Sequence, residues 1–323
     1  LIRYPNTVIF GEDVAIKGGV YNVTSDLHKI FGVRRVFDSP LDETSIVGFG
    51  IGFGHNGFIP IPEIQFLAYF HNAEDQLRGE AATLPFFSKG QFTNPMILRI
   101  PGLAYQKGFG GHFHNDNSLT IFRDIPGVIL AVPSNGSDAV KMLRTSVKEA
   151  VKNGRIVVFI EPIALYMTKD LYKPKDKKWT FKYPEPDEEI QLGNLKSYGE
   201  GNCLTIITYG NGLYLSLQAQ KLIEEELNKK IKVIDLRWLS DINYSVLIDE
   251  ISTCKKILIV DECRRKGSYG EGIFYELYKR INRNVKIKLH AAKNSFISLG
   301  KSATVTLPSK NSIFKISINF INE

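Results

Sequence analysis

Long apolar stretches are missing from this 323-residue sequence. Its apolar runs, such as residues 127–132, are far shorter than the roughly 20 residues that a membrane-spanning helix needs. The N-terminus lacks the charged and then apolar pattern of a signal peptide, so secretion is not expected. Cysteine is scarce, and Cys203, Cys254 and Cys263 lack metal-ligand spacing. Such an odd, sparse set argues against a disulfide framework and favours a reducing compartment, either the cytoplasm or an organelle such as the mitochondrial matrix.

Phosphate-binding loops are also missing from the sequence. It has neither a Gly-x-x-x-x-Gly-Lys-Ser/Thr loop nor a Gly-x-Gly-x-x-Gly turn between a strand and a helix. The alternating glycines of residues 48–54 are better explained by a helix packed closely against a neighbour. The net charge is +7, but the basic clusters at 173–178, 229–230 and 264–266 are short and lack interleaved aromatics. Solvated surface lysines are the favoured interpretation, and no nucleic-acid partner is expected.

The remaining composition is that of a globular protein, with 43% hydrophobic and 23% charged residues. Strand and helix signals alternate along both halves of the chain, which predicts an α/β fold of two domains, each a mainly parallel sheet with flanking helices. The expected strands are at residues 8–10, 59–64, 96–100, 128–132, 204–209, 231–236 and 257–260. The expected helices are at residues 44–56, 72–86, 213–227, 244–252 and 271–281. The predicted domains are 1–167 and 191–323, joined by a linker at 168–190 that is rich in Lys, Asp and Pro.

Acidic residues follow several of the expected strands. Ligands of such sheets bind beyond the carboxyl ends of the strands, which places residues 38–43, 63–69 and 102–114 near one rim. A partly buried carboxylate there can donate or accept a proton, so Asp38, Asp42, Glu43 and Glu63 are candidates. Asp42 is better explained as a helix cap because it precedes an expected helix. For Glu43, the residues alone leave both a functional and a structural role open.

A glycine-rich loop at residues 108–116 carries His112 and His114. Glycine lets the backbone approach a ligand closely, and histidine titrates near neutral pH. Acid–base or substrate contact is the preferred role, with a purely structural loop as the alternative. A metal site is less favoured because no third ligand stands at a telling spacing.

Taken in order along the chain, these segments resemble the beta subunit of the decarboxylating component of 2-oxoacid dehydrogenase complexes. The resemblance covers nearly the whole chain and includes the pyruvate, branched-chain and acetoin types. It is carried by residues 8–14 (VIFGEDV), 38–43 (DSPLDE), 63–66 (EIQF), 74–76 (EDQ), the His114 loop before 126–127 (PG), 234–240 (IDLRWLS) and 260–262 (VDE). The fold that it implies is transketolase-like, with a pyrimidine-binding domain followed by a transketolase C-terminal-type domain.

The resemblance also implies a cofactor and partners. Thiamine diphosphate would be shared with an alpha partner, whose Gly-Asp-Gly…Asn motif holds Mg²⁺ and is absent here, so no metal ligand is assigned to this chain. The alpha half is expected either as a separate subunit or as a fused domain, and the abrupt start at Leu1 together with residues 296–300 favours the fused form. Two beta halves would pair in an alpha2beta2-like assembly, which would deliver acyl groups to a lipoyl-bearing acyltransferase.

The resemblance assigns roles to four residues of this sequence. Glu43 matches the glutamate that bonds a ring nitrogen of the cofactor's aminopyrimidine and thereby favours the imino tautomer that activates the thiazolium. Gln65 and Tyr69 fall where the family packs the pyrimidine ring. His114 falls on the active-site histidine, expected to steer or protonate the intermediate and to assist acyl transfer.

Some segments depart from the family pattern. The loop before His114 is about two residues longer than in relatives, and Asn115-Asp116 stand where relatives often have Ser-Gln. The family's monovalent-cation site lies near the turn at 150–155, where Asn153 and Arg155 occupy the side-chain positions. We expect the Arg155 guanidinium to replace the cation there.

The expected activity is oxidative decarboxylation of a 2-oxoacid with acyl transfer to lipoamide. A branched-chain substrate is slightly favoured by the Glu-Ile-Gln-Phe…Tyr pattern of residues 63–69, with pyruvate or acetoin-type activity as the alternative. Transketolase-like group transfer and a non-catalytic scaffold are more distant alternatives.

Overall fold

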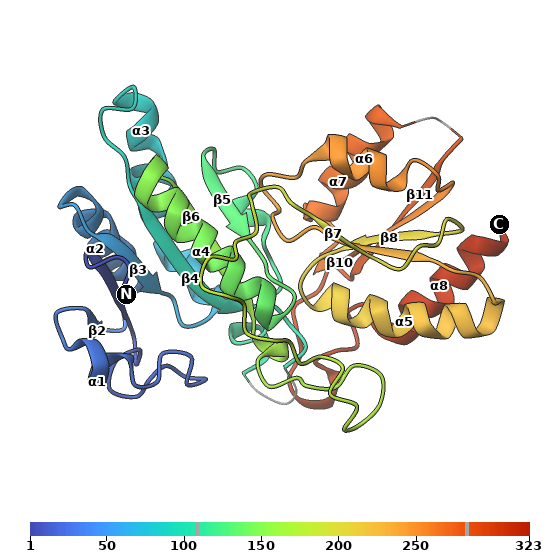
Figure 1. Cartoon of the computed structure of the whole chain (residues 1–323), viewed down its shortest axis with the longest axis horizontal. Coiled ribbons are helices and arrows are strands. Elements are labelled where there is room, and N and C mark those ends of the chain that lie inside the picture. Colours follow the sequence, from blue (N-terminus) through green and yellow to red (C-terminus); the bar gives the residue numbers. More distant parts are fainter. Residues whose placement is uncertain (107–109, 282–283) are drawn as a thin grey trace.

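The protein is described by a computed structural model covering residues 1–106, 110–281 and 284–323. It consists of two α/β domains that lie side by side, each built on one sheet (Figure 1). The predicted fold class is confirmed. Residues 108 and 109 of the predicted glycine-rich loop lie outside the described residues.

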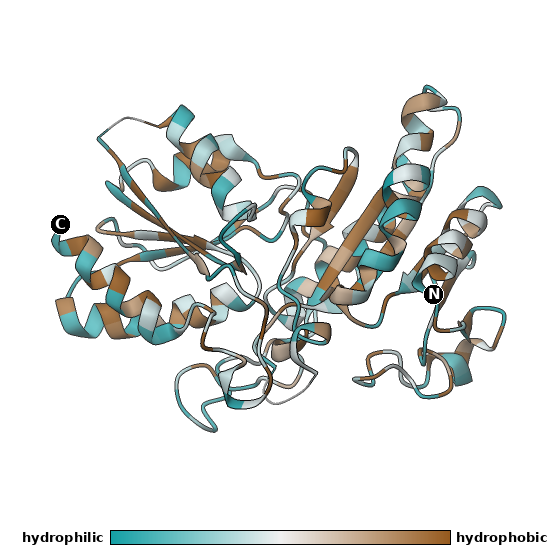
Figure 2. Ribbon diagram, turned by 180° about the vertical axis from the view of Figure 1, so that it is seen from behind, coloured by the Kyte–Doolittle hydropathy of each residue, from teal (hydrophilic) through white to brown (hydrophobic). Residues whose placement is uncertain are grey.

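The sheet of the first domain has six parallel strands in the order β2-β1-β3-β4-β6-β5. Their bounds are β1 (Thr7–Gly11), β2 (Val36–Asp38), β3 (Ile59–Glu63), β4 (Met96–Gly102), β5 (Val128–Ala131) and β6 (Ile156–Pro162). Every residue of the central strands β4 and β6 is buried, as expected for a parallel sheet covered on both faces. Figure 2 shows these strands as a hydrophobic band behind mixed helices.

The second sheet has five strands in the order β11-β10-β8-β9-β7, all parallel except β7. Their bounds are β7 (Lys196–Tyr198), β8 (Thr205–Thr208), β9 (Lys232–Asp235), β10 (Lys256–Arg264) and β11 (Lys286–Ala292). Helices α5 (Asn211–Leu227) and α8 (Lys310–Asn322) pack together on one face. Helices α6 (Tyr244–Ile251) and α7 (Tyr269–Arg280) cover the other face (Figure 1).

The first domain carries α1 (Leu27–Phe31), α2 (Glu43–His55), α3 (Thr83–Phe87) and α4 (Gly136–Asn153). Helix α2 packs against β3 and β4, and Gly50 shows why this helix is rich in glycine. A Cβ at Gly50 would lie 2.7 Å from Met96 Cε, so the close helix–sheet packing predicted for these glycines is confirmed at this position.

The single helix predicted at residues 72–86 is wrong in detail. The chain forms a 3-10 segment (Leu67–Ala73), a π turn (Gln76–Ala81) and the short helix α3. Pro85 cannot donate to the carbonyl of Ala81, and Asn94 Nδ2 binds that carbonyl at 2.8 Å instead. Thr83 Oγ1 donates to Gly79 O at 2.7 Å, so a side chain competes with the helical backbone bonds.

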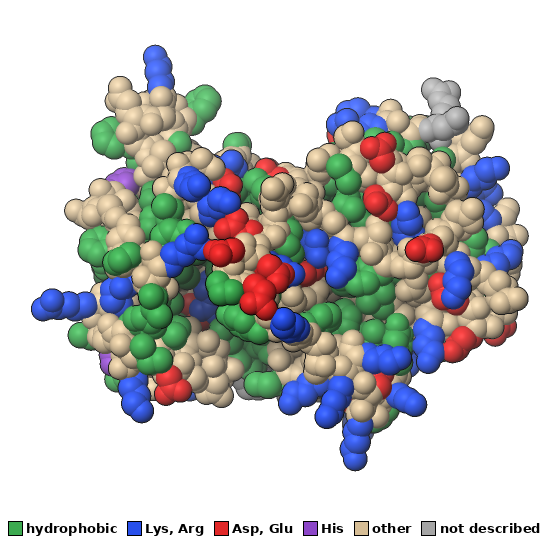
Figure 3. All heavy atoms as spheres, viewed as in Figure 1, with side chains coloured by type: hydrophobic (Ala, Val, Ile, Leu, Met, Phe, Trp, Pro, Cys, Tyr) green, Lys and Arg blue, Asp and Glu red, His purple; other side chains and the backbone are tan. Residues whose placement is uncertain are grey.

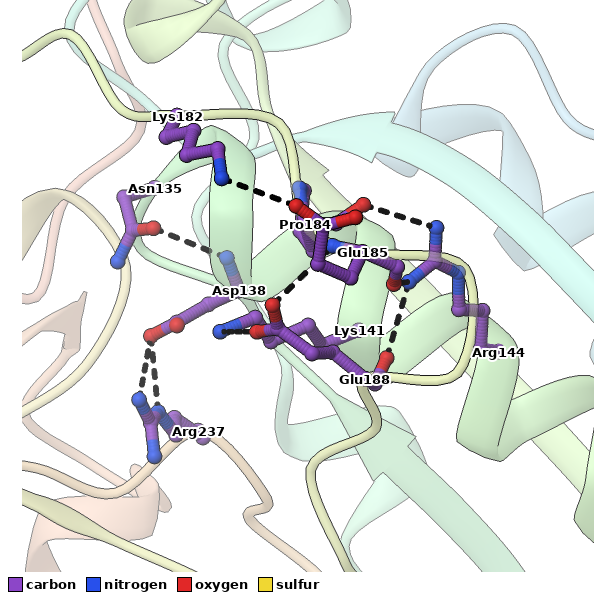
Figure 4. Close-up of polar contacts among 9 residues, drawn as sticks. All are labelled: Asn135, Asp138, Lys141, Arg144, Lys182, Pro184, Glu185, Glu188 and Arg237. Carbon is purple, nitrogen blue, oxygen red and sulfur yellow. Dashed lines mark hydrogen bonds and ion pairs between the residues drawn. The ribbon is translucent and has the colours of Figure 1, made fainter.

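The two domains are joined along strand β5. Val132 N donates to Arg237 O at 2.8 Å, and Leu239 N donates to Leu130 O at 2.9 Å, so a segment of the second domain covers the edge of the first sheet. The Arg237 guanidinium lies 2.7 Å from Asp138 Oδ2 in α4, and both side chains are buried (Figure 4). Backbone pairing and an ion pair therefore hold the domains together.

The stretch between β6 and β7 is fixed on α4 rather than free. Arg144 of α4 donates to the carbonyl oxygens of Pro184 (3.4 Å), Glu185 and Glu188 (3.1 Å) (Figure 4). Lys141 adds an ion pair with Glu188 at 2.7 Å. Backbone carbonyls held by one guanidinium leave this segment little freedom, although the domain boundaries themselves remain a prediction.

Within the described ranges, the chain contains no helix of the length and apolar character required to cross a bilayer. Cys203, Cys254 and Cys263 are free thiols.

Candidate active site

The carboxyl ends of the strands in the first sheet form the rim that the sequence predicted. The register aligns Gly11 of β1 with Asp38 of β2 and with Glu63 of β3, and Glu63 with Arg99 of β4. Residues that directly follow these strands therefore emerge at one edge of the sheet, where ligands of α/β folds bind.

Glu43 is the first residue of α2 and is only 9% exposed. Asp42 caps the helix, because its side chain accepts from Ser45 N at 3.3 Å, and the cap interpretation is confirmed. Asn72 Nδ2 donates to Glu43 Oε2 at 3.2 Å. The cap fixes where the helix begins and Asn72 fixes the carboxylate, so Glu43 has a defined direction before any ligand binds.

A second acid lies beside Glu43. Glu12 directly follows β1, and its pKa is raised by burial and then by the charges of Asp13 and Glu43. The pKa of Tyr69 is also raised, first by burial and then by Glu43 and Glu12. Two carboxyls and a phenol therefore share one region. Glu12 was not among the residues predicted for the site, although its place just after an expected strand was a usable signal.

His114 lies against aromatic rings of the same rim. Its ring centroid is 4.4 Å from that of Phe66 and 6.0 Å from that of Tyr69. Gly110 has a φ of +65°, and a Cβ there would lie 1.8 Å from His114 Nδ1. Only glycine fits this position, which explains sterically why the predicted loop has a glycine at residue 110.

Gln65 follows β3 at the same edge and is half-buried. Its neighbours are fixed, because Ile64 N donates to Arg99 O at 3.0 Å and Phe66 is buried beneath His114. The structure thus groups Glu43, Tyr69 and His114 and places Gln65 beside them, and the roles assigned to them remain predictions.

The rings of His112 and His114 contact different neighbours. His112 lies against Phe113 and Phe296, with ring centroids at 4.1 and 5.4 Å, whereas His114 lies against Phe66. Among the residues that the structure describes, His, Cys, Asp and Glu side chains form no cluster of three that could hold a metal ion.

Two of the candidate acids have structural roles. Asp38 accepts from Ala15 N at 2.7 Å and from Ile16 N at 3.3 Å, and so fixes the loop after β1. Glu63 is buried and lies 2.7 Å from Arg99 Nη1, whose Nε lies 2.6 Å from Glu161. Burial raises the pKa of Glu63 although Arg99 opposes the shift. Its partners come from β4 and β6, so spacing in the sequence could not have shown the pairing.

The second domain holds the His114 loop in place. Arg264 Nη1 donates to Asp116 Oδ1 and Asn117 Oδ1, each at 3.2 Å, and Asn117 Nδ2 donates to Glu262 O at 2.6 Å. Glu262 also accepts from Ala104 N at 3.2 Å, and its burial between the domains raises its pKa to about 7. Residues 262–264 therefore support the segment before the loop, at Ala104, and the segment after His114, at residues 116–117. This role was not predicted from the sequence.

The Arg155 guanidinium donates to Gly127 O at 3.4 Å. Gly127 belongs to the loop before β5, not to the turn at 150–155. Asn153 Nδ2 donates to Glu149 Oε2 at 2.7 Å, within its own helix. Replacement of a structural cation by Arg155 stays a prediction.

Comparisons with known proteins agree with this architecture. Residues 1–169 match the family described as "Transketolase, pyrimidine binding domain", and residues 193–302 match "Transketolase, C-terminal domain". A solved structure described as "Split gene transketolase, inactive beta4 tetramer" superposes with a TM-score of 0.75 at 17% identity, covering 99% of this chain and 94% of the other. At that identity the likeness shows the fold alone.

Curated relatives are more similar in sequence. The "Pyruvate dehydrogenase E1 component subunit beta" of Staphylococcus aureus is 31% identical over 317 residues, covering 96% of this chain and 91% of the relative. The protein of the same name from Staphylococcus epidermidis is 31% identical over 322 residues, covering 98% and 92%. With both domain families matched in order and nearly the full length aligned, the chain belongs to the transketolase-like family of 2-oxoacid dehydrogenase E1 beta subunits.

Proposed function

We propose that this beta subunit, together with an alpha partner, carries out the thiamine diphosphate-dependent oxidative decarboxylation of a 2-oxoacid and passes the acyl group to lipoamide. The observation that carries the proposal is the buried, pre-oriented Glu43 carboxylate at the strand rim, beside Tyr69 and His114.

The chemistry of these residues fits an aminopyrimidine ring. Glu43 offers a carboxylate to a ring nitrogen, and burial strengthens a hydrogen bond of this kind. Tyr69 offers an aromatic face against which a flat ring packs, and the buried Phe66 ring supports Tyr69 edge-on. The bound cofactor would supply the electron sink for the loss of CO₂, which no side chain provides.

The other roles follow from position. Glu12 raises the local negative potential and so helps to keep a proton between Glu43 and the ring nitrogen. His114 is a proton donor or acceptor for the reacting carbonyl and for acyl transfer. Its orientation is fixed by the ring of Phe66 below it and by the close backbone of Gly110.

The alpha partner is needed to complete the site. The Gly-Asp-Gly…Asn motif expected to hold the diphosphate and Mg²⁺ is absent from this sequence, so that half is assigned to the partner. The proposed assembly pairs two such halves in an alpha2beta2-like complex that serves a lipoyl-bearing acyltransferase. An obligate contact of this type buries upwards of about 2,000 Å².

Pyruvate is the better-supported substrate within this proposal. The sequence pattern at residues 63–69 slightly favoured a branched-chain 2-oxoacid, whereas the curated relatives described above are named pyruvate dehydrogenase subunits. Comparing kcat/KM for pyruvate and 3-methyl-2-oxobutanoate in the assembled enzyme decides between them.

The assembled enzyme with Glu43→Gln tests the proposal. Loss of the carboxylate is expected to lower decarboxylation, measured with ferricyanide as oxidant, by about 10²–10⁴-fold, in the range of a lost acid–base group. Protein yield and melting temperature should change little because the amide occupies the same volume.

Asp42→Asn is the matched control. It removes the adjacent carboxylate at the start of the same helix, and asparagine caps a helix as well as aspartate does. Activity close to that of the unmodified enzyme is expected. Full activity of the Glu43→Gln enzyme, or equal losses in both variants, would refute the assignment.

A further inference from the structure

The segment at residues 169–182, here called the lysine loop, is the most basic stretch of the linker. Its six lysines, all exposed, are Lys169, Lys173, Lys175, Lys177, Lys178 and Lys182. In Figure 1 the loop projects from the lower edge of the molecule, and Figure 3 shows Lys and Arg side chains gathered there. Its only acids are Asp170 and Asp176.

Both aspartates are turned toward the backbone of the loop. Asp176 accepts from the backbone N–H groups of Leu171, Tyr172, Lys173 and Lys178 at 2.8–3.0 Å. Asp170 accepts from Lys175 N at 2.7 Å and Lys177 N at 2.8 Å. Desolvation raises the pKa of Asp176, but these amide donors outweigh it and hold the pKa below its ordinary value. The carboxylates fix the shape of the loop, and the lysines carry its outward charge.

The base of the loop is anchored on the second domain. Leu171 and Trp179 are each only 6% exposed. Tyr214 OH of α5 donates to Asp170 O at 2.8 Å, and Gln218 Nε2 donates to Leu171 O. The backbone of a loop held in this way has little conformational entropy left to lose on binding.

Lys175 and Lys177 occupy backbone positions that do not suit lysine. Their φ angles are +66° and +51°, in the left-handed region where glycine or asparagine is favoured. Each costs on the order of 1 kcal/mol relative to glycine. The amide of each lysine donates to the Asp170 carboxylate, which holds the backbone in this conformation.

The lysine loop begins beside the candidate active site. Tyr166 lies three residues before Lys169, and its ring centroid is 5.4 Å from that of Tyr21. Tyr21 OH donates to Gln106 Oε1 at 2.7 Å, and Gln106 Nε2 donates to His114 O. The Tyr21 ring centroid also lies 6.4 Å from that of Phe66, the ring that contacts His114, so the start of the loop is linked to the site by direct contacts.

We propose that the lysine loop is the docking surface for an acidic face of the protein domain that presents the acyl acceptor to His114. The inference rests on the proposed function. Clustered charge on a rigid loop steers an oppositely charged partner, which raises the association rate and makes it sensitive to salt.

The test uses the assembled alpha–beta enzyme with thiamine diphosphate, Mg²⁺ and 2-oxoacid. Two acceptors are compared: ferricyanide, a small oxidant, and a lipoylated domain of the cognate acyltransferase. The variant is Lys173→Glu/Lys175→Glu/Lys177→Glu. The KM for the lipoylated domain is expected to rise at least about tenfold, while turnover with ferricyanide stays unchanged.

The matched control reverses three exposed lysines of the second domain, as Lys229→Glu/Lys255→Glu/Lys279→Glu. It has the same net charge and should keep the KM of the unmodified enzyme. The reversed loop could also lower turnover with ferricyanide. In that case, the same three lysines are changed to glutamine, and the unmodified enzyme is assayed over a series of salt concentrations. The KM for the lipoylated domain must rise in the glutamine variant and must rise with salt.

An unchanged KM in the loop variants, an equal rise in the control, or a KM that does not increase with salt would overturn the docking proposal. So would binding of RNA by the loop without any change in the KM for the lipoylated domain. Absence of ferricyanide-linked decarboxylation in the unmodified enzyme would instead refute the proposed function, so the two failures are distinguishable.

Discussion

Replacement of Arg99 by methionine is expected to destabilise the first domain severely, and to do so in a pH-dependent way. Arg99 is 5% exposed and lies between Glu63 (4%) and Glu161 (8%), with N–O distances of 2.7 and 2.6 Å. Methionine fills a similar volume but leaves two carboxylates buried without their cation. Removing one partner of a buried ion pair costs about 3–5 kcal/mol. At about 2–4 °C per kcal/mol, the melting temperature should fall by about 6–20 °C near neutral pH.

The sign of the pH dependence follows from Glu63. Burial already raises its pKa with Arg99 present, and loss of Arg99 removes the positive charge that opposes this shift. A carboxyl whose pKa is raised in the folded state contributes stability that is complete below its unfolded pKa and is lost as the pH rises through the folded value. The deficit of Arg99→Met should therefore shrink as the pH falls toward about 4.5, near the ordinary glutamate pKa.

Differential scanning calorimetry of the variant across this pH range measures both effects. Arg78→Met is the control, because Arg78 is exposed and its ion pairs with Glu74 (3.8 Å) and Asp75 (3.4 Å) lie on the surface. Such pairs contribute at most about 1 kcal/mol. A fall of under about 2 °C for Arg99→Met, or a deficit that does not change with pH, would refute the reasoning.

Two further predictions concern the helix cap and the domain interface. Asp42→Ala removes the cap of α2 and should lower stability by about 1 kcal/mol, read as a fall of about 2–4 °C in melting temperature, whereas Asp42→Asn should not. An equal effect of both substitutions would contradict the capping role. Burial raises the pKa of Glu262 to about 7, so its contribution is complete below its unfolded pKa and is lost as the pH rises through about 7. Glu262→Gln should therefore show a smaller fall in melting temperature between about pH 5.5 and pH 8 than the unmodified protein. An unchanged slope would show that Glu262 is already ionised.

The sheets were predictable where apolar runs are short and bounded by turn residues. Strands β3, β4 and β8 lie at their expected places because glycine or proline marks their ends. Strand β6 was not predicted, since an apolar run such as Ile156–Pro162 fits a strand or a buried helix equally well without its neighbours. Strand β11 alternates lysine with apolar residues, a period-two signal that could have been used.

The candidate site was predictable only in its main residues. Glu43 stands directly before an expected helix and His114 lies in a glycine-rich loop, so both carry local signals. Asn72 binds Glu43, and Arg264 binds Asp116 in the His114 loop; both come from segments that only folding brings together. The broken helix at 67–87 depends on Asn94, which takes a carbonyl that Pro85 leaves free.

The closure of strand β5 has a consequence for how the chain can be divided. Val132 N donates to Arg237 O, Leu130 O accepts from Leu239 N, and Leu130 N donates to Ser240 Oγ, so residues 237–240 cover the β5 margin of the first sheet. Exposed strand margins recruit other chains and promote aggregation. The C-terminal half therefore shields this edge of the N-terminal half, and a cut between them would expose the amides of Leu130 and Val132 that the intact polypeptide keeps hydrogen-bonded.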